Sequence, residues 1–340
     1  MGPINISHLT APLTKILDFM QISLSKAYQL LMSGQVVAVP TETVYGLAAS
    51  IERPAAIDQI FTLKGRPSNN PLIIHIAKTE QILAYTHSFP KDFMNLAKTF
   101  WPGPLTMILP IDPASVPVRA CAGLPTAAFR IPHHSLTLAL LEWVGPLVMP
   151  SANLSGKPSA TRREHVEADF GKEFPVVDGG VCGHGVESTI IHYSEKCWQI
   201  ARLGAIPAEA FESVLGYIPE KVNGDRGTHP ICPGQLYRHY APKARLNLCS
   251  DWEQCQGIVL GFSERHYTKA RRVLTMGTIS CPEQVAESLY ALLRQLDVEG
   301  IEEACVDLDF PRNGLWATIA ERLSKAALHV PLSSEENRVP

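Results

Sequence analysis

The sequence predicts a two-domain α/β protein, and three observations support this expectation. The chain has 340 residues and is 46% hydrophobic, whereas a single hydrophobic core stops growing at roughly 250–300 residues. Short apolar runs alternate with helical patterns, as in sheets covered by helices. Between residues 221 and 245, Gly, Pro, Arg, His and Tyr replace the aliphatic residues, which is typical of a linker. We therefore expect a first domain over 22–220, a linker over 221–245, a second domain over 246–340 and an N-terminal extension over 1–21.

Two helices and two strands open the first domain. Apolar residues at helical spacing over 24–31, followed by a glycine, predict the first helix. The apolar run 36–39 predicts a short strand that a proline ends, and a second helical pattern covers 55–63. The unbroken apolar run 72–76 predicts a buried strand.

The rest of the first domain contributes further strands and one helix. Aliphatic runs between turns rich in Pro and Gly predict strands over residues 105–109, 127–131, 147–149, 188–191 and 198–201. Thr161, with Glu164 three residues later, matches a capping box, so we expect a helix that Thr161 caps.

The second domain repeats the alternation of strand and helix. An apolar strand over 257–262 precedes an amphipathic helix over 285–296. A strand over 304–308 then precedes a helix over 315–327. This order predicts a small α/β domain with a largely parallel sheet.

Charge and cysteine spacing exclude some classes of protein. Residues 1–245 carry 21 basic and 19 acidic residues, and residues 246–340 carry 9 and 14, so the two parts differ in sign but neither is strongly charged. This charge does not by itself indicate a nucleic-acid binder. The eight cysteines form no Cys-x-x-Cys pair, so the sequence contains neither a zinc knuckle nor a thioredoxin-like motif, and we expect reduced thiols. No secretory leader and no apolar run of about 20 residues is present, so we expect a cytoplasmic protein without a membrane span.

Basic and hydroxyl side chains point to a site for a phosphate chain and a small carboxylate. Arg66 offers a planar fork of donors and Lys64 a compact charge, and both suit oxyanions. Ser151 and Asn153 would add neutral hydrogen bonds. No phosphate-binding glycine motif is present, so bound ATP would need side chains from separate loops. Arg130, in an otherwise apolar strand, is either a solvated strand end or an anion ligand.

Several short motifs occur in a characteristic order. In the first domain they are Pro40-Thr-Glu-Thr-Val-Tyr-Gly-Leu47, Lys64-Gly-Arg-Pro67, Asn70-Pro-Leu72, Trp101-Pro-Gly-Pro-Leu-Thr106, Phe129-Arg-Ile-Pro132, Pro150-Ser-Ala-Asn-Leu-Ser-Gly156 and Glu187-Ser-Thr189. Together they closely resemble the YrdC family of threonylcarbamoyl-AMP synthases. The stretches 233–242 and 314–327 resemble the long, two-domain form of that family.

The resemblance implies a fold and a reaction. The fold is a twisted, open α/β sheet with a concave, positively lined cavity, followed by a small Rossmann-like domain. The reaction converts L-threonine, bicarbonate and ATP, with Mg²⁺, into threonylcarbamoyl-adenylate and pyrophosphate. A separate transferase complex then moves the threonylcarbamoyl group to tRNA. No tightly bound, protein-ligated metal is implied.

The resemblance also assigns roles to residues. The central catalytic tetrad is Lys64, Arg66, Ser151 and Asn153. The threonine-binding residues are Thr41, His75, Arg130, Ser151 and Ser188. The nucleotide-binding residues are Arg66, Asn70, Thr126, Asn153, Thr161 and Arg202.

We further expect residues 237–240 to close over the cavity as a lid, with Tyr240 reaching the nucleotide, because a carbamate intermediate decomposes in water. On this hypothesis, Tyr240→Ala lowers synthesis and leaves the fold intact.

A rival function is a non-catalytic module that binds double-stranded RNA or tRNA through the basic concave face. Salt-dependent RNA affinity without ATP consumption would favour it. Phosphate contacts alone do not require His75 or the hydroxyl-rich turns, which favours the enzyme. A weak tRNA contact is compatible with both functions.

Overall fold

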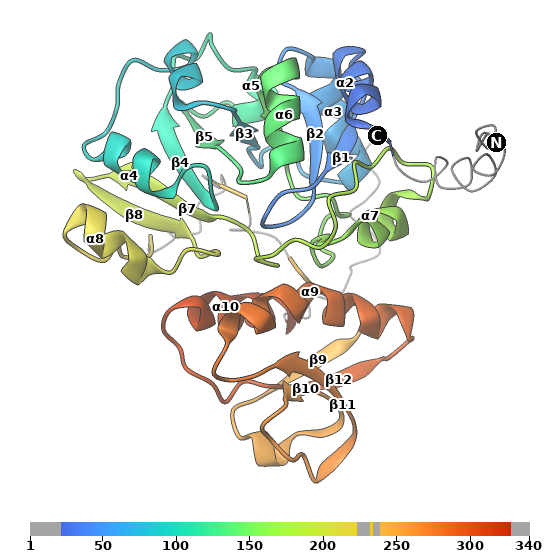
Figure 1. The fold of residues 1–340 in the computed structure, drawn as a ribbon. Helices are drawn as coiled ribbons and strands as arrows, with labels where there is room; N and C mark the ends of the chain where they lie inside the picture. Colours follow the sequence, from blue (N-terminus) through green and yellow to red (C-terminus); the bar gives the residue numbers. More distant parts are fainter. Residues whose placement is uncertain (1–21, 223–231, 234–238, 328–340) are drawn as a thin grey trace, which may run out of the picture.

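The computed structural model describes residues 22–222, 232–233 and 239–327. Figure 1 shows two layered units: a large sheet with its helices, and a smaller sheet on which two helices lie. These two helices, α9 (Pro282–Val298) and α10 (Leu315–Ala327), are placed between the small sheet and the first domain. The expected fold class, a twisted α/β sheet plus a small second α/β domain, is confirmed.

The first sheet is mixed and has eight strands among the described residues. Its order in space is β1 (Val37–Val39), β2 (Gly46–Ser50), β6 (Leu147–Val148), β3 (Ile73–His75), β5 (Thr126–Arg130), β4 (Leu105–Pro110), β7 (Thr189–Ser194) and β8 (Cys197–Arg202). The pairs β3·β5 and β4·β7 are parallel, and the other neighbours are antiparallel. Strand β2 was not among the predicted elements.

Helices cover this sheet and bury its apolar side chains. They are α2 (Leu24–Met32), α3 (Pro54–Lys64), η1 (Thr79–Ala84), α4 (Phe93–Phe100), α5 (Val118–Cys121), α6 (Ser135–Val144), α7 (Arg163–Phe170), η2 (Ala208–Phe211) and α8 (Glu212–Leu215). Helix α3 ends where Gly65 adopts a left-handed conformation (φ 60°), which glycine tolerates without strain.

The predicted capping box at Thr161 is wrong. Helix α7 begins at Arg163, and its N-cap residue, Arg162, makes no side-chain cap. The backbone N–H of Thr161 instead donates to Nδ1 of His165 (3.2 Å). The ring of His165 thus binds the N–H group that a capping box would pair with the side chain of Glu164.

The small sheet is parallel throughout its described strands. Its order is β11 (Lys269–Gly277), β10 (Gln256–Phe262), β12 (Glu303–Asp307) and β9 (Arg245–Cys249), with a short 3₁₀ helix, η3 (Trp252–Gln254), before β10. Apolar residues on one face of the sheet pack against α9 and α10 in a single core. Strand β9 begins at Arg245, the last residue of the predicted linker. The domain boundaries themselves stay predictions, since much of 221–245 lies outside the described residues.

The two domains are in close contact beside α9. Gly185 has φ 66°, and an added Cβ would lie 2.2 Å from the carbonyl oxygen of Ala286, so only glycine fits there. Among the described residues, no helix is both long and apolar enough to cross a membrane.

Candidate active site

A small cavity of about 50 Å³ lies against the central strands of the first sheet. Three guanidinium groups and one carboxylate contribute to its wall. Its polar lining consists of Thr43, Arg66, His75, Arg130, Ser151, Glu187, Ser188 and Arg202. Because arginines outnumber carboxylates, the cavity favours anionic ligands.

His75 and Arg130 are direct neighbours, because they are register partners on the parallel strands β3 and β5. Both side chains are buried. Nη2 of Arg130 donates to Oε1 of Glu42 (2.7 Å), and its Nε donates to the carbonyl of Gly103 (3.2 Å). Burial would raise the pKa of Glu42, but the charge and hydrogen bond of Arg130 outweigh it and lower the pKa. Glu42 therefore holds Arg130 in place as a charged partner.

His75 is neutral at physiological pH. Burial and the charge of Arg130 lower its pKa well below the usual value. Its Nδ1 lies 3.2 Å from the carbonyl oxygen of Ile73. With Nδ1–H donating to this carbonyl, Nε2 carries the lone pair and can accept a hydrogen bond.

We predict that His75 makes the protein less stable in acid. Above about pH 6.5 the ring is neutral in both the folded and the unfolded chain, so the stability is fully present. As pH falls below that value, His75 binds a proton in the unfolded chain but not in the folded chain. The free energy of unfolding therefore decreases. His165 and His239, whose pKa burial lowers to about 3, act in the same direction. The free energy of unfolding should fall less between pH 7 and pH 5 in His75→Asn than in the wild type, by up to about 2 kcal/mol.

Urea unfolding at pH 7 and pH 5 measures this difference. The exposed His87, replaced by Asn, is the matched control. An equal acid-induced loss in wild type and His75→Asn would contradict the account.

Arg202 and Ser188 form another part of the cavity wall. Nη2 of Arg202 donates to the carbonyl oxygen (2.9 Å) and to Oγ (3.1 Å) of Ser188, and Oγ also lies 2.8 Å from Oγ1 of Thr106. The backbone at Gly204 packs directly against the backbone of Ser188. Only glycine fits there, because a Cβ would lie 2.3 Å from the carbonyl carbon of Ser188. Ser188 is thus fixed by its neighbours before any ligand arrives.

Lys64 shapes the site without lining the cavity. Its buried ammonium donates to the carbonyl oxygens of Ser151 (2.5 Å) and Asn153 (2.6 Å). Burial and the charge of Arg66 lower its pKa well below the usual value. Lys64 therefore fixes the turn that follows β6. This contact orients the predicted tetrad, while Arg66 and Ser151 are the members that face the cavity.

Glu187 connects the cavity to the second domain. Its buried carboxylate accepts hydrogen bonds from Oγ of Ser159 (2.6 Å), the hydroxyl of Tyr290 (2.9 Å) and Nε of Arg322 (2.9 Å). Burial alone would raise the pKa of Glu187, but the positive charges of Arg322 and Arg202 lower it. Glu42 and Glu187 were absent from the predicted site, although both belong to the quoted motifs.

Two predicted nucleotide ligands have unsatisfied oxygens. Oδ1 of Asn70 and Oδ1 of Asn153 are buried and have no hydrogen-bond partner within the described ranges. Buried polar atoms are normally satisfied, so these two oxygens are suited to accept from a ligand.

Neither Asn70 nor Asn153 is among the described residues that line the cavity, and the same holds for Thr41, Thr126 and Thr161. Thr126 begins β5 and Arg130 ends it, which separates them by about 13 Å. Thr41 uses its hydroxyl within its own turn, where it donates to the carbonyl of Val44 (2.6 Å). Thr161 is buried beside His165.

Tyr240 packs at the interface with the second domain. Its ring stacks on Tyr290 (centroids 5.4 Å apart), and the guanidinium of Arg322 lies over it at 4.8 Å. Burial raises the pKa of Tyr240 to about 12. Removing a buried aromatic ring costs about 3–5 kcal/mol, so we expect Tyr240→Ala to lower the stability of the protein as well as synthesis. Of the predicted lid, residues 237 and 238 lie outside the described residues.

Two family models match this chain. One, described as "Telomere recombination" and covering the Sua5, YciO and YrdC proteins, matches residues 29–204. The other, described as "Threonylcarbamoyl-AMP synthase, C-terminal domain", matches residues 206–328.

Individual proteins are similar over nearly the whole chain. A threonylcarbamoyl-AMP synthase of Bacillus subtilis is 40% identical over 321 residues, which cover 89% of this chain and 92% of that protein. A threonylcarbamoyl-AMP synthase of Pyrococcus abyssi is 38% identical over 314 residues, which cover 86% and 91%. The crystal structure of P. abyssi Sua5 complexed with L-threonine aligns with a TM-score of 0.81 at 36% identity, covering 89% of this chain and 94% of that chain.

Proposed function

This chain belongs to the Sua5-type threonylcarbamoyl-AMP synthases, and we infer that the cavity beside His75, Arg130 and Arg202 is where its reactants meet. The enzyme is a nucleotidyltransferase that joins L-threonine, bicarbonate and ATP into threonylcarbamoyl-AMP, with release of pyrophosphate. This is the first step of threonylcarbamoyladenosine formation in tRNA. The observation that carries the assignment to this cavity is the set of three arginines around one neutral histidine.

The reaction explains why such a cavity is needed. The threonine amine attacks bicarbonate, which forms the carbamate and releases water. A carbamate oxygen then attacks the α-phosphate of ATP and displaces pyrophosphate, so both steps bring anions together. Fixed positive groups in a site that excludes water stabilise such transition states without reorganisation. We assign the stabilisation of these transition states to the arginines. We expect the positioning of the reactants to supply most of the remaining rate acceleration.

Threonine binds on the Arg130 side in this proposal. The guanidinium of Arg130 receives the threonine carboxylate, and its pairing with Glu42 fixes its orientation. Ser188 and Nε2 of the neutral His75 offer hydrogen-bond partners for the threonine hydroxyl and amine. Thr41 acts indirectly, by holding the turn that carries Thr43 into the cavity.

ATP binds on the Arg66 side. Arg66 lines the cavity, and its Nη2 donates to the carbonyl of Pro71 (2.9 Å), so its orientation is fixed. The unsatisfied oxygens of Asn70 and Asn153 accept from the nucleotide. Arg202 lies within reach of the phosphates, and Thr126, Thr161 and Tyr240 stay predicted contacts.

Mg²⁺ enters with the nucleotide as part of the substrate. Glu42 and Glu187, the carboxylates beside the arginines of the cavity, are both engaged in ion pairs. We therefore expect phosphate oxygens and water to be the ligands of Mg²⁺ in this site.

The cavity must widen when ATP binds, since nucleotide-sized ligands occupy roughly 300 Å³ or more. Nη1 of Arg202 donates to the carbonyl of Pro233 (3.4 Å), so part of the wall comes from the stretch between the domains. The lid over residues 237–240 stays a prediction. Transfer of the product to a separate transferase complex, and a weak tRNA contact, remain predictions. Because the chain is a synthase, RNA binding without catalysis is set aside as its sole function.

Separate arginines should control the two substrates. Arg130→Gln, combined with Glu42→Gln so that no buried carboxylate is left unpaired, should weaken L-threonine binding at least about 10-fold, since a hydrogen bond to a charged group contributes about 1.5–3 kcal/mol. Arg66→Gln should weaken Mg-ATP binding by a similar factor and leave threonine affinity within about 2-fold. Calorimetric titration of each substrate measures both effects.

Arg119→Gln is the matched control, because Arg119 pairs with Asp58 on the surface. Unchanged threonine affinity in the Arg130 variant, with the protein folded, would remove Arg130 from the threonine site. Equal losses for both substrates in both variants would contradict the division of the cavity.

A further inference from the structure

Three cysteines that are distant in sequence meet in the second domain. Cys249 ends β9, Cys255 precedes β10, and Cys305 lies within β12. Their sulfur atoms all lie within 4.8 Å of one another, and the Sγ atoms of Cys249 and Cys305 are 3.0 Å apart. Cys255 and Cys305 are buried, and Cys249 is half-buried. Sequence spacing gave no sign of this cluster.

The cluster lies on the face of the small sheet that is opposite to its helices. Residues such as Leu246 and Val306 point into the core with α9 and α10, whereas Cys255 and Cys305 pack with Val259 and Tyr267 in a separate cluster. Figure 1 shows both helices between this sheet and the first domain. The thiols are therefore remote from the synthase cavity.

The geometry suits a soft metal ion. Zinc–thiolate bonds are about 2.3 Å long, so thiolates around one tetrahedral zinc are about 3.8 Å apart. The sulfur–sulfur distances in the cluster range from 3.0 Å up to at most 4.8 Å, so they lie on both sides of this value. The distance between the sulfurs of Cys249 and Cys305 would increase by about 0.8 Å on binding zinc. Thiolates select soft ions such as Zn²⁺ and Cu⁺ over hard ions such as Mg²⁺.

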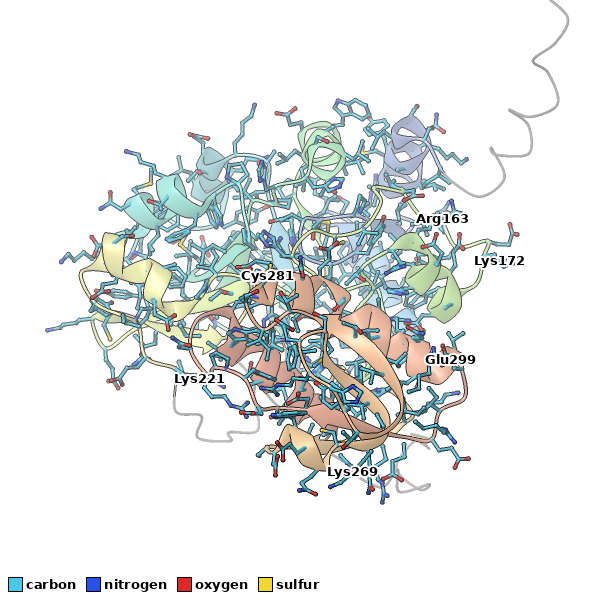
Figure 2. All side chains as sticks on the ribbon, turned by 60° about the horizontal axis from the view of Figure 1, so that its bottom comes forward. Arg163, Lys172, Lys221, Lys269, Cys281 and Glu299 are labelled. Atoms are coloured by element: carbon cyan, nitrogen blue, oxygen red, sulfur yellow. The ribbon has the colours of Figure 1, made fainter. Side chains whose placement is uncertain are left out.

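A second cavity adjoins the cluster and supplies an open side. It has a volume of about 610 Å³, and Cys249 and Cys305 line it. Lys269 and Arg271 line it as well, and Figure 2 places Lys269 at the outer end of the small domain. A metal held by three thiolates would thus have room for a fourth, exogenous ligand. The two basic side chains, beside the carboxylate of Glu303, would face the negative charge of the complex.

A simpler role explains less. Cysteines often fill cores as small apolar residues, but that role does not require three sulfurs at mutual contact.

We propose that Cys249, Cys255 and Cys305 form a binding site for one soft, thiophilic metal ion, Zn²⁺ or Cu⁺, whose fourth position opens to the adjoining cavity. Binding replaces three S–H bonds by three sulfur–metal bonds and releases three protons to solvent, with no change of oxidation state. The metal ties β9, β10 and β12 together. Its effect is therefore on the stability of the second domain, while the synthase chemistry proceeds in the other domain.

The test uses the full-length, tag-free protein, purified with a phosphine reductant and without chelators. The protein is incubated separately with Zn²⁺ and with Cu⁺ and then passed through a desalting column, and the bound metal is measured by inductively coupled plasma mass spectrometry. We expect about one equivalent per chain of at least one of the two ions. Co²⁺ in place of the native ion should give sulfur-to-cobalt charge-transfer absorption, which reports thiolate ligation directly.

Cys305→Ser and Cys249→Ser should reduce the bound metal below about 0.2 equivalent, because only two thiolates remain. Cys249 is half-buried at a strand end, so its variant guards against misfolding of the more buried Cys305 variant. Cys281→Ser is the matched control, since Cys281 directly precedes α9 and lies far from Lys269 (Figure 2). The control should keep the full equivalent, and all three variants should still make threonylcarbamoyl-AMP.

Three outcomes would overturn the proposal. The first is the absence of stoichiometric Zn²⁺ or Cu⁺ in the reduced, folded protein. The second is metal that persists in both Cys249→Ser and Cys305→Ser. The third is a Cys249–Cys305 disulfide, seen by mass spectrometry of protein purified under reductant, in place of metal.

Discussion

Replacing Arg322 by Met should lower the free energy of unfolding by about 3–5 kcal/mol, because it leaves the carboxylate of Glu187 buried without its charged partner. The side chain of Arg322 is fully buried. Its Nε donates to Glu187 at 2.9 Å, and its Nη2 donates to the carbonyl of Leu203 at 2.6 Å. Because Glu187 lies in the first domain and Arg322 in α10, the loss should appear as weakened docking of the two domains.

A double-variant cycle isolates this pair. Glu187→Gln alone should also destabilise the protein, since the buried Arg322 cation then keeps only Glu321 as a carboxylate partner (Nη1 to Oε2, 2.7 Å). The combination Glu187→Gln/Arg322→Met should recover part of the loss, because neither charge then remains. Chemical denaturation followed by fluorescence and by circular dichroism measures each stability.

Arg272→Met is the control for the loss of an arginine. Arg272 pairs with Glu299, which Figure 2 places on the exposed side of the small domain. Its replacement should leave stability unchanged within error. Additive losses in the Glu187/Arg322 double variant would show that the two groups do not interact.

Lys64→Met should reduce catalytic efficiency by about 100-fold or more, although Lys64 does not line the cavity. The ammonium binds two carbonyls of the turn that carries Ser151 and Asn153. Methionine keeps the length of the side chain but donates to neither carbonyl. The turn should then shift by a fraction of an ångström or more, and both kcat and the KM for ATP should change because Asn153 moves with it.

Steady-state kinetics with each substrate varied in turn measures this effect. Lys78→Met is the control, since Lys78 forms an exposed ion pair with Glu142. Full activity in Lys64→Met would contradict the role of Lys64 in positioning the turn. A loss confined to kcat, with unchanged KM for ATP, would instead place its charge at the reacting atoms.

Local patterns predicted most elements of the fold. The predicted helix over 315–327 has the bounds of α10, and the apolar runs 72–76 and 304–308 overlap β3 and β12. Strand β11 was missed because it is an exposed edge strand that begins with charged residues, Lys269, Arg271 and Arg272, and so lacks an apolar run. Edge strands bury little surface, and their sequences resemble loops.

Several residues that line the cavity belong to motifs visible in the sequence, but their contacts could not be predicted from it. His75 and Arg130 are 55 positions apart in sequence, and only the register of β3 against β5 makes them neighbours. Sequence gives the charge of Lys64 but not the direction of its ammonium, which points to backbone carbonyls. The Cys249–Cys305 contact likewise depends on the pairing of β9 with β12. Long-range register is fixed by the packed fold and leaves no local signal.

The most direct test of the central claim is product formation at this cavity. Purified protein is incubated with Mg-ATP, L-threonine and bicarbonate, and threonylcarbamoyl-AMP is quantified by mass spectrometry, together with reactions that each omit one substrate. We predict product only when all three substrates are present, a loss of about 100-fold or more in Lys64→Met, and unchanged product in Lys78→Met. Product that forms equally well in Lys64→Met and in the Arg130→Gln/Glu42→Gln variant would contradict the assignment of the reaction to this cavity.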